Sequence, residues 1–300
     1  MTAAIEVIGI DKSFQAGCPV LTNIGFTIAR GEMVALIGAS GSGKSTLIRA
    51  IAGLVDVDRP QRRDHGRRIG SIRILGAPMQ EEGRISGAAS RLRARVGVIF
   101  QQFNLVPRLS VLTNVCLGLL GQVPQWRGSL GGFTRAERQQ AMKALDRVGI
   151  AEHALKRGSQ LSGGQQQRAA IARTLVQGAQ VLIADEPIAS LDPSAARRVM
   201  DMLAELNRQD RITVLVSLHQ VEYALAYCPR TIALREGGIV YDGPTSALTP
   251  AFLGELYGAE SEELILPGAG AATPDISATN GPLTNGRPVT LGEVVAAGAA

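Results

Sequence analysis

The sequence predicts an α/β fold whose core is a mostly parallel sheet. The first observation is a set of short apolar runs, typical of strands buried on both faces: Met33–Ile37, Val96–Phe100, Val181–Ala184 and Thr213–Val216. The second is that helical patterns separate these runs, as expected when crossover helices join parallel strands. The third is a glycine-rich loop at residues 38–43, between the first run and a helix.

The N-terminal region predicts two further strands and a helix. Ala4–Ile10 and Gly25–Ile28 have the pattern of half-buried strands. Lys44–Ala52 has the pattern of a helix, and Gly53 is placed to end it. The segment Asp58–Arg68 is polar and is expected to form a loop.

The middle of the chain predicts an inserted group of helices. Within residues 104–160, Thr134 and Glu137 form a capping box that opens a helix. Apolar residues recur at helical spacing after this box, at Ala141, Leu145 and Val148. Another helical stretch is expected after Pro193.

Composition excludes several classes of protein. The chain has 300 residues, 45% of them hydrophobic, which is enough for a sizeable core and excludes a wholly disordered or fibrous chain. No run of about 18 apolar residues predicts a membrane-spanning helix, and the N-terminus lacks a secretory signal pattern, so we expect a cytosolic protein. Cys18, Cys116 and Cys228 have no metal-ligand spacing, and buried free thiols are expected.

The charge is basic but dispersed. The net charge is +5, and because residues 260–300 carry five acids and one arginine, residues 1–259 carry +9. The arginines are scattered, with one cluster at Arg62, Arg63, Arg67 and Arg68 that has no interleaved aromatic residues, so a solvated loop is favoured over a nucleic-acid site. Residues 267–300 are rich in Gly, Ala, Pro, Thr and Asn, and predict a disordered tail.

A phosphate-binding loop is the first chemical motif. Gly38–Ser45 matches G-x-x-x-x-G-K-[ST], with a buried strand before it and a helix after it. Its glycines let backbone N–H groups surround phosphate oxygens, Lys44 can reach the β- and γ-phosphates, and Ser45 can bind Mg²⁺. The predicted phosphate-binding set is Gly38, Ala39, Ser40, Gly41, Ser42, Gly43, Lys44, Ser45 and Thr46.

An acidic strand end is the second motif. The apolar run Val181–Ala184 is followed by Asp185 and Glu186. A carboxylate at this point can hold Mg²⁺, so Asp185 is a candidate metal ligand. Glu186 is placed to orient the attacking water or accept its proton.

A third motif lies between them. Residues 161–168 read LSGGQQQR, and here the sequence resembles the ATP-binding-cassette (ABC) ATPases, whose signature is LSGGQ. Other cassette motifs follow in the family's order over residues 4–258. Gln101 and Asp192 match the Q-loop and D-loop, His219 matches the switch histidine, and Phe14 matches an aromatic residue that stacks on adenine.

The resemblance implies a fold and a mechanism. The fold is a P-loop NTPase ABC cassette with a mostly parallel core, an antiparallel β subdomain and an inserted helical subdomain. Two copies bind ATP and Mg²⁺ between them, with catalytic residues Glu186, His219 and Gln101 and metal ligands Ser45, Gln101 and Asp185. The second copy's signature loop and D-loop complete each site through Ser162, Gly163, Gly164, Gln165 and Asp192.

Two stretches, residues 103–115 and 216–230, resemble the ATP-binding subunits of bacterial phosphonate importers. That family implies a peripheral protein on the cytoplasmic face of the inner membrane. Its partners are permease subunits and, indirectly, a periplasmic binding protein, with no nucleic acid. The predicted ATPase domain spans residues 1–258, with helices at about 104–170 and a tail at 259–300.

Alternatives remain open at this point. The importer can carry another ligand, such as phosphite, phosphate or another small anion, because the resemblance alone supplies the ligand. A soluble ABC protein acting on nucleic acid or ribosomes has only the basic charge in its favour. A non-hydrolysing regulatory cassette conflicts with the intact set Lys44, Asp185, Glu186 and His219.

Overall fold

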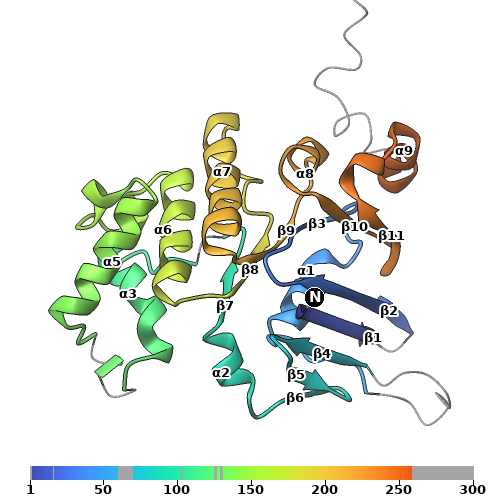
Figure 1. The fold of residues 1–300 in the computed structure, drawn as a ribbon, viewed down its shortest axis with the longest axis horizontal. Coiled ribbons are helices and arrows are strands. Elements are labelled where there is room, and N and C mark those ends of the chain that lie inside the picture. The colour runs from blue at the N-terminus through green and yellow to red at the C-terminus, as the bar shows by residue number, and fades with distance from the viewer. Residues whose placement is uncertain are drawn as a thin grey trace, which may run out of the picture. The chain divides into compact units, whose positions relative to one another are not determined.

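A computed structural model describes residues 2–15, 17–59, 70–102, 104–124, 127–128 and 131–258. A sheet with the strand order β11-β10-β3-β9-β8-β7 lies at its centre (Figure 1). Its five strands from β10 to β7 are parallel, and β11 is antiparallel to β10. The bounds of these strands are β3 Met33–Ile37, β7 Val96–Ile99, β8 Val181–Asp185, β9 Thr213–Ser217, β10 Arg230–Arg235 and β11 Gly238–Pro244.

The central strands confirm the apolar runs seen in the sequence. Every residue of β3, β8 and β9 is buried. β8 and β9 each extend by one polar residue, Asp185 and Ser217, beyond the predicted run, whereas β7 ends at Ile99 rather than at Phe100. The two extensions matter because they place buried polar groups at the carboxyl edge of the sheet.

A second, antiparallel sheet has the strand order β2-β1-β4-β5-β6. The N-terminal strands are longer than predicted, because the hairpin between them continues through several register shifts to the pair Gln15 and Cys18. Strands β4 to β6 were not predicted from the sequence. Of the predicted loop at residues 58–68, residues 60–68 lie outside the described part. The bounds are β1 Ala3–Gln15, β2 Cys18–Ala29, β4 Ser71–Ile74, β5 Ala77–Glu81 and β6 Arg84–Ile85.

The predicted helix starts are confirmed by their caps. In α5 the Thr134 hydroxyl accepts a hydrogen bond from the Glu137 amide, and the Glu137 carboxylate accepts one from the Thr134 amide. Helix α7 begins at Pro193. The helices are α1 Lys44–Ile51, α2 Ala89–Arg93, α3 Val111–Cys116, α5 Arg135–Arg147, α6 Gly163–Val176, α7 Pro193–Asp210, α8 Val221–Tyr227 and α9 Pro250–Tyr257. Short 3₁₀ turns are η1 Leu117–Gly121, η2 Ala151–His153, η3 Gly158–Gln160 and η4 Thr245–Ala247.

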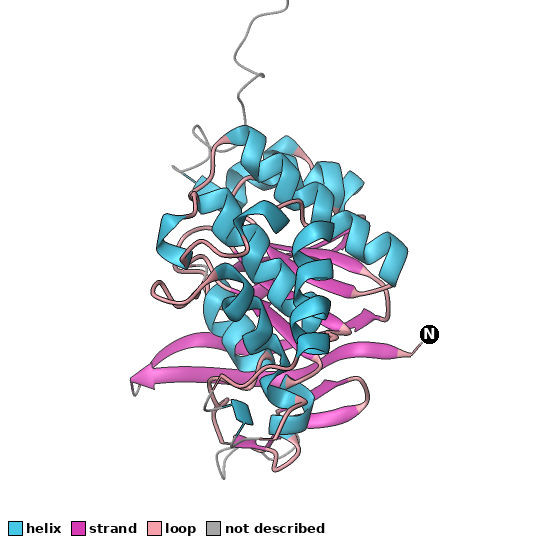
Figure 2. Cartoon of the chain, turned by 90° about the vertical axis from the view of Figure 1, so that its left-hand side faces the viewer, coloured by secondary structure: helices cyan, strands magenta, loops and turns pink. Residues whose placement is uncertain are grey.

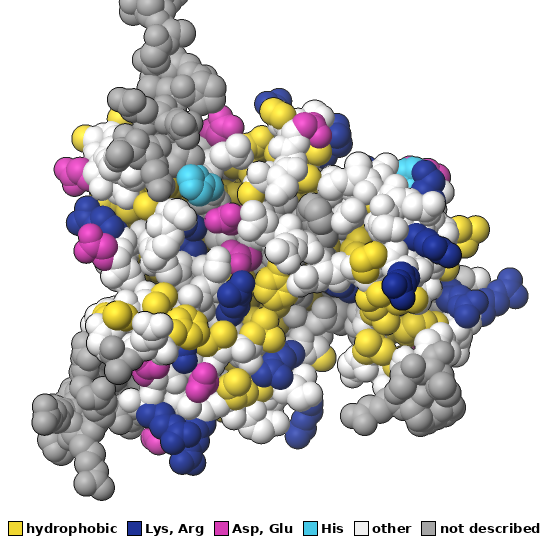
Figure 3. All heavy atoms as spheres, turned by 180° about the vertical axis from the view of Figure 1, so that it is seen from behind, with side chains coloured by type: hydrophobic (Ala, Val, Ile, Leu, Met, Phe, Trp, Pro, Cys, Tyr) yellow, Lys and Arg dark blue, Asp and Glu magenta, His cyan; other side chains and the backbone are white. Residues whose placement is uncertain are grey.

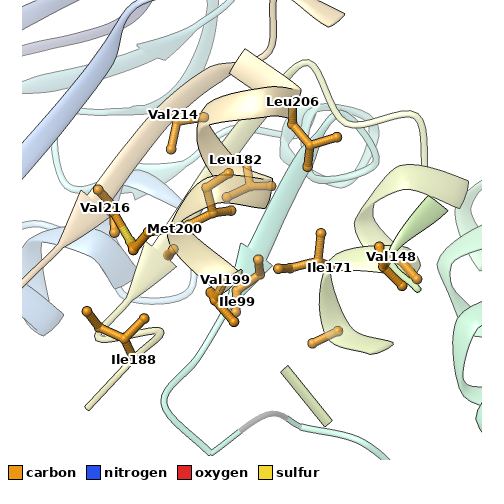
Figure 4. Packing of buried hydrophobic residues seen from close by; sticks show 14 of the residues in the cluster. Ile99, Val148, Ile171, Leu182, Ile188, Val199, Met200, Leu206, Val214 and Val216 are labelled. Carbon is orange, nitrogen blue, oxygen red and sulfur yellow. The ribbon is translucent and has the colours of Figure 1, made fainter. Parts of the chain in front are cut away.

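The parallel sheet is buried on both faces. In β3, Met33, Ala35 and Ile37 belong to one hydrophobic cluster, while Val34 and Leu36 belong to the other. Alternate residues of a strand point to opposite faces, so this division places a core on each side of the sheet. Figure 4 shows part of the first cluster, in which sheet residues meet α6 and α7: Ile99, Ile171, Leu182, Val199, Met200, Val214 and Val216.

Helices α3, α5 and α6 lie together beside α7 (Figure 1). Figure 2, seen from their side, shows these helices in front of the strands. The predicted helical subdomain ends at about residue 170, whereas helix α6 continues to Val176. The bounds of this subdomain therefore stay a prediction. The predicted tail at residues 259–300 lies outside the described part. Within the described part, no helix combines the length and apolar character needed to cross a membrane.

The expectation for the cysteines is wrong at one position. Cys116 and Cys228 are buried free thiols, but Cys18 is exposed. Cys18 opens β2 at the end of the long hairpin, where it is paired with Gln15. No local pattern in the sequence marks how far the hairpin extends, so the exposed position of Cys18 could not be predicted.

Candidate active site

The carboxyl ends of three neighbouring parallel strands bring the predicted site together. β3 lies next to β9, and β9 lies next to β8. The phosphate loop follows β3, Glu186 follows β8, and His219 lies two residues after β9. Parallel strands end at the same edge, which is where open α/β sheets bind their ligands.

The phosphate loop depends on glycine for its path. Gly38, Gly41 and Gly43 all have positive φ angles, of 149°, 78° and 101°. A Cβ atom on Gly38 would lie 2.3 Å from the Leu234 carbonyl oxygen, so only glycine fits there. The loop leads directly into α1, whose first three residues are Lys44, Ser45 and Thr46. Backbone N–H groups at such a helix start favour an anion.

The side chains of the loop fit a phosphate ligand. Lys44 is buried, and its Nζ donates hydrogen bonds to the carbonyl oxygens of Gly38 at 2.6 Å and Ala39 at 3.1 Å. The Ser42 Oγ is buried and has no hydrogen-bond partner among the described residues. Buried polar groups in native proteins are nearly always hydrogen-bonded, so a buried hydroxyl beside a buried ammonium fits a ligand rich in acceptor oxygens.

Asp185 and Ser45 fit a magnesium ion. The Ser45 hydroxyl donates to Asp185 Oδ1 at 3.2 Å, although the two residues are 140 positions apart. Among the described residues, no group of three or more His, Cys, Asp or Glu side chains is placed to hold a metal. Mg²⁺ bound with a nucleotide needs only one or two protein oxygens, because phosphate oxygens and waters complete its shell.

Ser217 joins the two acidic residues and was not singled out from the sequence. Its fully buried hydroxyl donates to Asp185 Oδ1 at 2.9 Å and accepts from the Glu186 backbone N–H at 2.8 Å. Glu186 has a φ angle of +48°, a strained conformation for a residue with a side chain. The sequence feature that could have identified Ser217 is its position directly after the apolar run Thr213–Val216.

Glu186 and His219 line the same hollow, of about 300 Å³. Ser217, although fully buried, is among the residues that border this hollow. The ring centre of His219 is 6.2 Å from that of Tyr257 in α9. Two of the three predicted catalytic residues, Glu186 and His219, therefore border one space.

The predicted signature loop and D-loop line a second hollow, of about 250 Å³. Ser162 caps α6 and Asp192 caps α7, so two helix starts face this space. Hydrogen bonds from the Ser194 hydroxyl and the Ala195 amide hold the pKa of Asp192 below its ordinary value, which keeps the carboxylate charged. The predicted residues that line the hollow are Ser162, Gly163, Gly164, Gln165 and Asp192.

Phe14 and Gln101 belong neither to the phosphate loop nor to the residues that line the two hollows. Phe14 is 63% exposed on β1, and the Lys12 ammonium lies 5.2 Å from its ring centre. Gln101 is exposed shortly after the end of β7. Both side chains are available to a ligand, but neither contacts the groups described above.

The comparison with known families decides the identity. Residues 21–189 match the family described as ABC transporter, and they make up more than half of the chain. This chain belongs to the ABC transporter family. The ABC cassette predicted from the motifs is confirmed in family and fold, and as such a cassette the chain is an ATPase.

Relatives of this ABC cassette are close in sequence. The phosphonates import ATP-binding protein PhnC of Stutzerimonas stutzeri is 58% identical over 266 residues, which are 89% of this chain and 94% of that protein. A protein of the same description from Cupriavidus metallidurans is 55% identical, over 88% of this chain and 90% of that protein.

Solved cassettes share the fold. The dimeric structure of MJ0796, a bacterial ABC transporter cassette, is 30% identical with a TM-score of 0.68, over 81% of this chain and 100% of that chain. A second dimeric structure of MJ0796, in a post-hydrolysis state bound to ADP and phosphate, has a TM-score of 0.67 at 30% identity and the same coverage.

Proposed function

We propose that this chain is the ATP-hydrolysing subunit of a membrane importer for phosphonates. The observation that supports the hydrolytic part is the convergence of Lys44, Asp185, Glu186 and His219 at the ends of three adjacent strands. The support for phosphonate is the identity of 55–58% to import proteins of that description over nearly nine-tenths of the chain. Phosphite, phosphate or another small anion is the alternative cargo.

ATP binds to the phosphate loop of one copy in this proposal. The backbone N–H groups of residues 38–46 and the Lys44 ammonium hold its phosphates, while Phe14 stacks on adenine. Ser45, Asp185 and Gln101 hold Mg²⁺, which neutralises charge on the phosphate oxygens. Lys44 then exchanges its two carbonyl partners for phosphate oxygens, since an ammonium bonds more strongly to an anion.

Hydrolysis uses the hollow between Glu186 and His219. Glu186 orients the attacking water and accepts its proton, and His219 holds the γ-phosphate and steadies Glu186. Gln101 senses the metal and the water. A second copy supplies Ser162, Gly163, Gly164, Gln165 and Asp192, an arrangement supported by the dimeric form of the solved relatives.

The remaining partners follow from the importer assignment. Integral permease subunits hold the cassette at the cytoplasmic face of the inner membrane, and a periplasmic binding protein delivers the ligand. We assign residues 1–258 to the ATPase domain, residues 104–170 to its helical subdomain and residues 259–300 to a tail. Basic side chains on the face in Figure 3 lie in separate groups, a distribution that gives no support to a nucleic-acid partner there.

The hydrolytic roles are tested with Glu186→Gln. This variant keeps the shape of the side chain but removes the carboxylate, so it is expected to bind ATP and accumulate as a closed dimer with little turnover. Sedimentation with ATP and Mg²⁺, together with phosphate release, measures both effects. Near-normal hydrolysis would remove Glu186 from its proposed role.

The cargo is tested by growth. A strain lacking this chain is grown with a phosphonate, phosphite or phosphate as the sole phosphorus source. Loss of growth on phosphonate alone, restored by the wild-type chain but not by the Glu186→Gln variant, supports the proposal. Loss on phosphite instead, or normal growth on phosphonate with no second uptake system present, would contradict the phosphonate assignment.

A further inference from the structure

One histidine outside the described motifs contacts the signature loop. His153 belongs to no motif in the sequence, yet its Nε2 lies 2.8 Å from the Nε2 of Gln165. His153 ends the η2 turn, and its side chain is only 16% exposed. A residue of the helical insertion therefore holds the last residue of LSGGQ.

The direction of this hydrogen bond follows from the other end of Gln165. Its Oε1 accepts a hydrogen bond from the Ser162 backbone N–H at 2.9 Å, so its amide nitrogen faces the imidazole. That nitrogen can only donate, and the ring Nε2 must accept. This direction of the hydrogen bond requires the tautomer that has its proton on Nδ1.

This arrangement is not explained by the packing of His153 alone. The Nδ1 atom is buried and has no hydrogen-bond partner among the described residues, an arrangement that costs free energy. The carboxylate of Glu152, which is largely exposed, lies 3.4 Å from Nε2 and favours a proton on that atom. The contact with the Gln165 amide instead favours a proton on Nδ1, because it leaves Nε2 free to accept.

Gln165 in turn closes the start of α6. The Ser162 hydroxyl accepts from the Gln165 amide, while the Gln165 side chain accepts from the Ser162 amide, so each residue caps the other. If the Gln165 side chain rotated, the Ser162 N–H would lose its acceptor. The signature loop would then be ordered only when a ligand binds, and that ordering would weaken the binding.

We propose that His153 is a positioning residue for the signature loop: it holds the Gln165 amide so that Ser162 and Gly164 are already arranged for the nucleotide of the second copy. The inference rests on the proposed function, in which this loop acts across a dimer. It predicts that His153 affects dimer closure but not the binding of ATP to a single copy. The reason is that the phosphate loop follows β3, whereas His153 lies in η2 and Gln165 in α6.

The experiment uses the full chain with Glu186→Gln as the parent. His153→Leu removes the acceptor but keeps an apolar side chain of moderate size, and His153→Gln supplies a new acceptor oxygen. Leu155→Ala is the matched control, because Leu155 follows η2 but is 86% exposed. Titration with fluorescent ATP at low protein concentration gives single-copy affinity, and sedimentation at rising concentration gives the dimerisation constant.

A net hydrogen bond corresponds to about a fivefold change in an equilibrium constant. A dimer contains two such loops, so His153→Leu is expected to weaken ATP-driven dimerisation about 25-fold and to leave single-copy ATP affinity within about twofold of the parent. His153→Gln is expected to recover most of the loss, and Leu155→Ala to match the parent.

A double-mutant cycle separates positioning from general destabilisation. If His153 acts through the amide of Gln165, then His153→Leu causes little further loss in a Gln165→Ala chain. Equal loss of single-copy ATP affinity and dimerisation, additive losses in the cycle, or normal dimerisation of His153→Leu would each overturn the inference. If His153→Leu does not fold, the comparison of His153→Gln with Gln165→Ala decides, because only the latter should lose closure. Failure of the parent itself to dimerise would refute the proposed function, and the role of His153 would fall with it.

Discussion

Removal of the Ser217 hydroxyl is expected to lower the rate of hydrolysis as well as the stability of the fold. In Ser217→Ala, the Asp185 carboxylate loses a donor at 2.9 Å and the Glu186 amide loses its acceptor at 2.8 Å. Glu186 is already in the strained left-handed region, with φ at +48°. The Glu186 carbonyl keeps a hydrogen bond from the Ala189 amide at 3.3 Å, but the amide side of the residue depends on the Ser217 hydroxyl.

The magnitude follows from the two lost bonds. A hydrogen bond to a charged group contributes about 1.5–3 kcal/mol, and an orphaned buried donor costs about 1–3 kcal/mol. Glu186 is partly exposed, so water can replace part of the second contribution. We expect a loss of about 3 kcal/mol, which corresponds to a fall in Tm of about 6–12 °C. A displaced catalytic group is expected to lower kcat about tenfold or more.

The matched control is Thr231→Val. The Thr231 hydroxyl is equally buried and bonds the Thr245 hydroxyl at 2.8 Å, away from the site, so its removal should lower Tm but not kcat. Phosphate release by the assembled transporter at saturating ATP gives kcat, and calorimetry gives Tm. If Ser217→Ala lowers Tm but keeps the kcat of the wild type, Ser217 does not position Glu186.

Two further predictions concern the loop and the thiols. Gly38→Ala places a Cβ 2.3 Å from a carbonyl oxygen and should lower the stability of the nucleotide-free chain by about 3–5 kcal/mol. Gly41→Ala is strained but lies in open space, so it should lower stability by only about 1–2 kcal/mol. Equal melting temperatures of the two variants would contradict this prediction. Burial raises the pKa of Cys116 to about 11 and that of Cys228 to about 12, so at pH 8 these thiols stay protonated. A thiol reagent should modify exposed Cys18 in the native chain and the other two only after unfolding; mass spectrometry of a second native adduct would refute this.

Much of the fold was accessible because its signals are local. The runs that became β3, β8 and β9 are continuously apolar, and the capping box of α5 needs only residues three apart. The short strands β4 to β6 were missed, since such segments owe their pairing to β1 and to one another rather than to a pattern of their own.

The phosphate loop, the acidic strand end and the signature can be recognised from the sequence alone. Each is a contiguous segment whose glycines, caps and charged groups define its conformation and chemistry locally. Two contacts become visible only in the folded chain: Ser217 joins Asp185 to Glu186, and His153 faces Gln165. Those contacts depend on which strands are neighbours and how a helical insertion packs, and both are set by burial over the whole chain rather than by any short pattern.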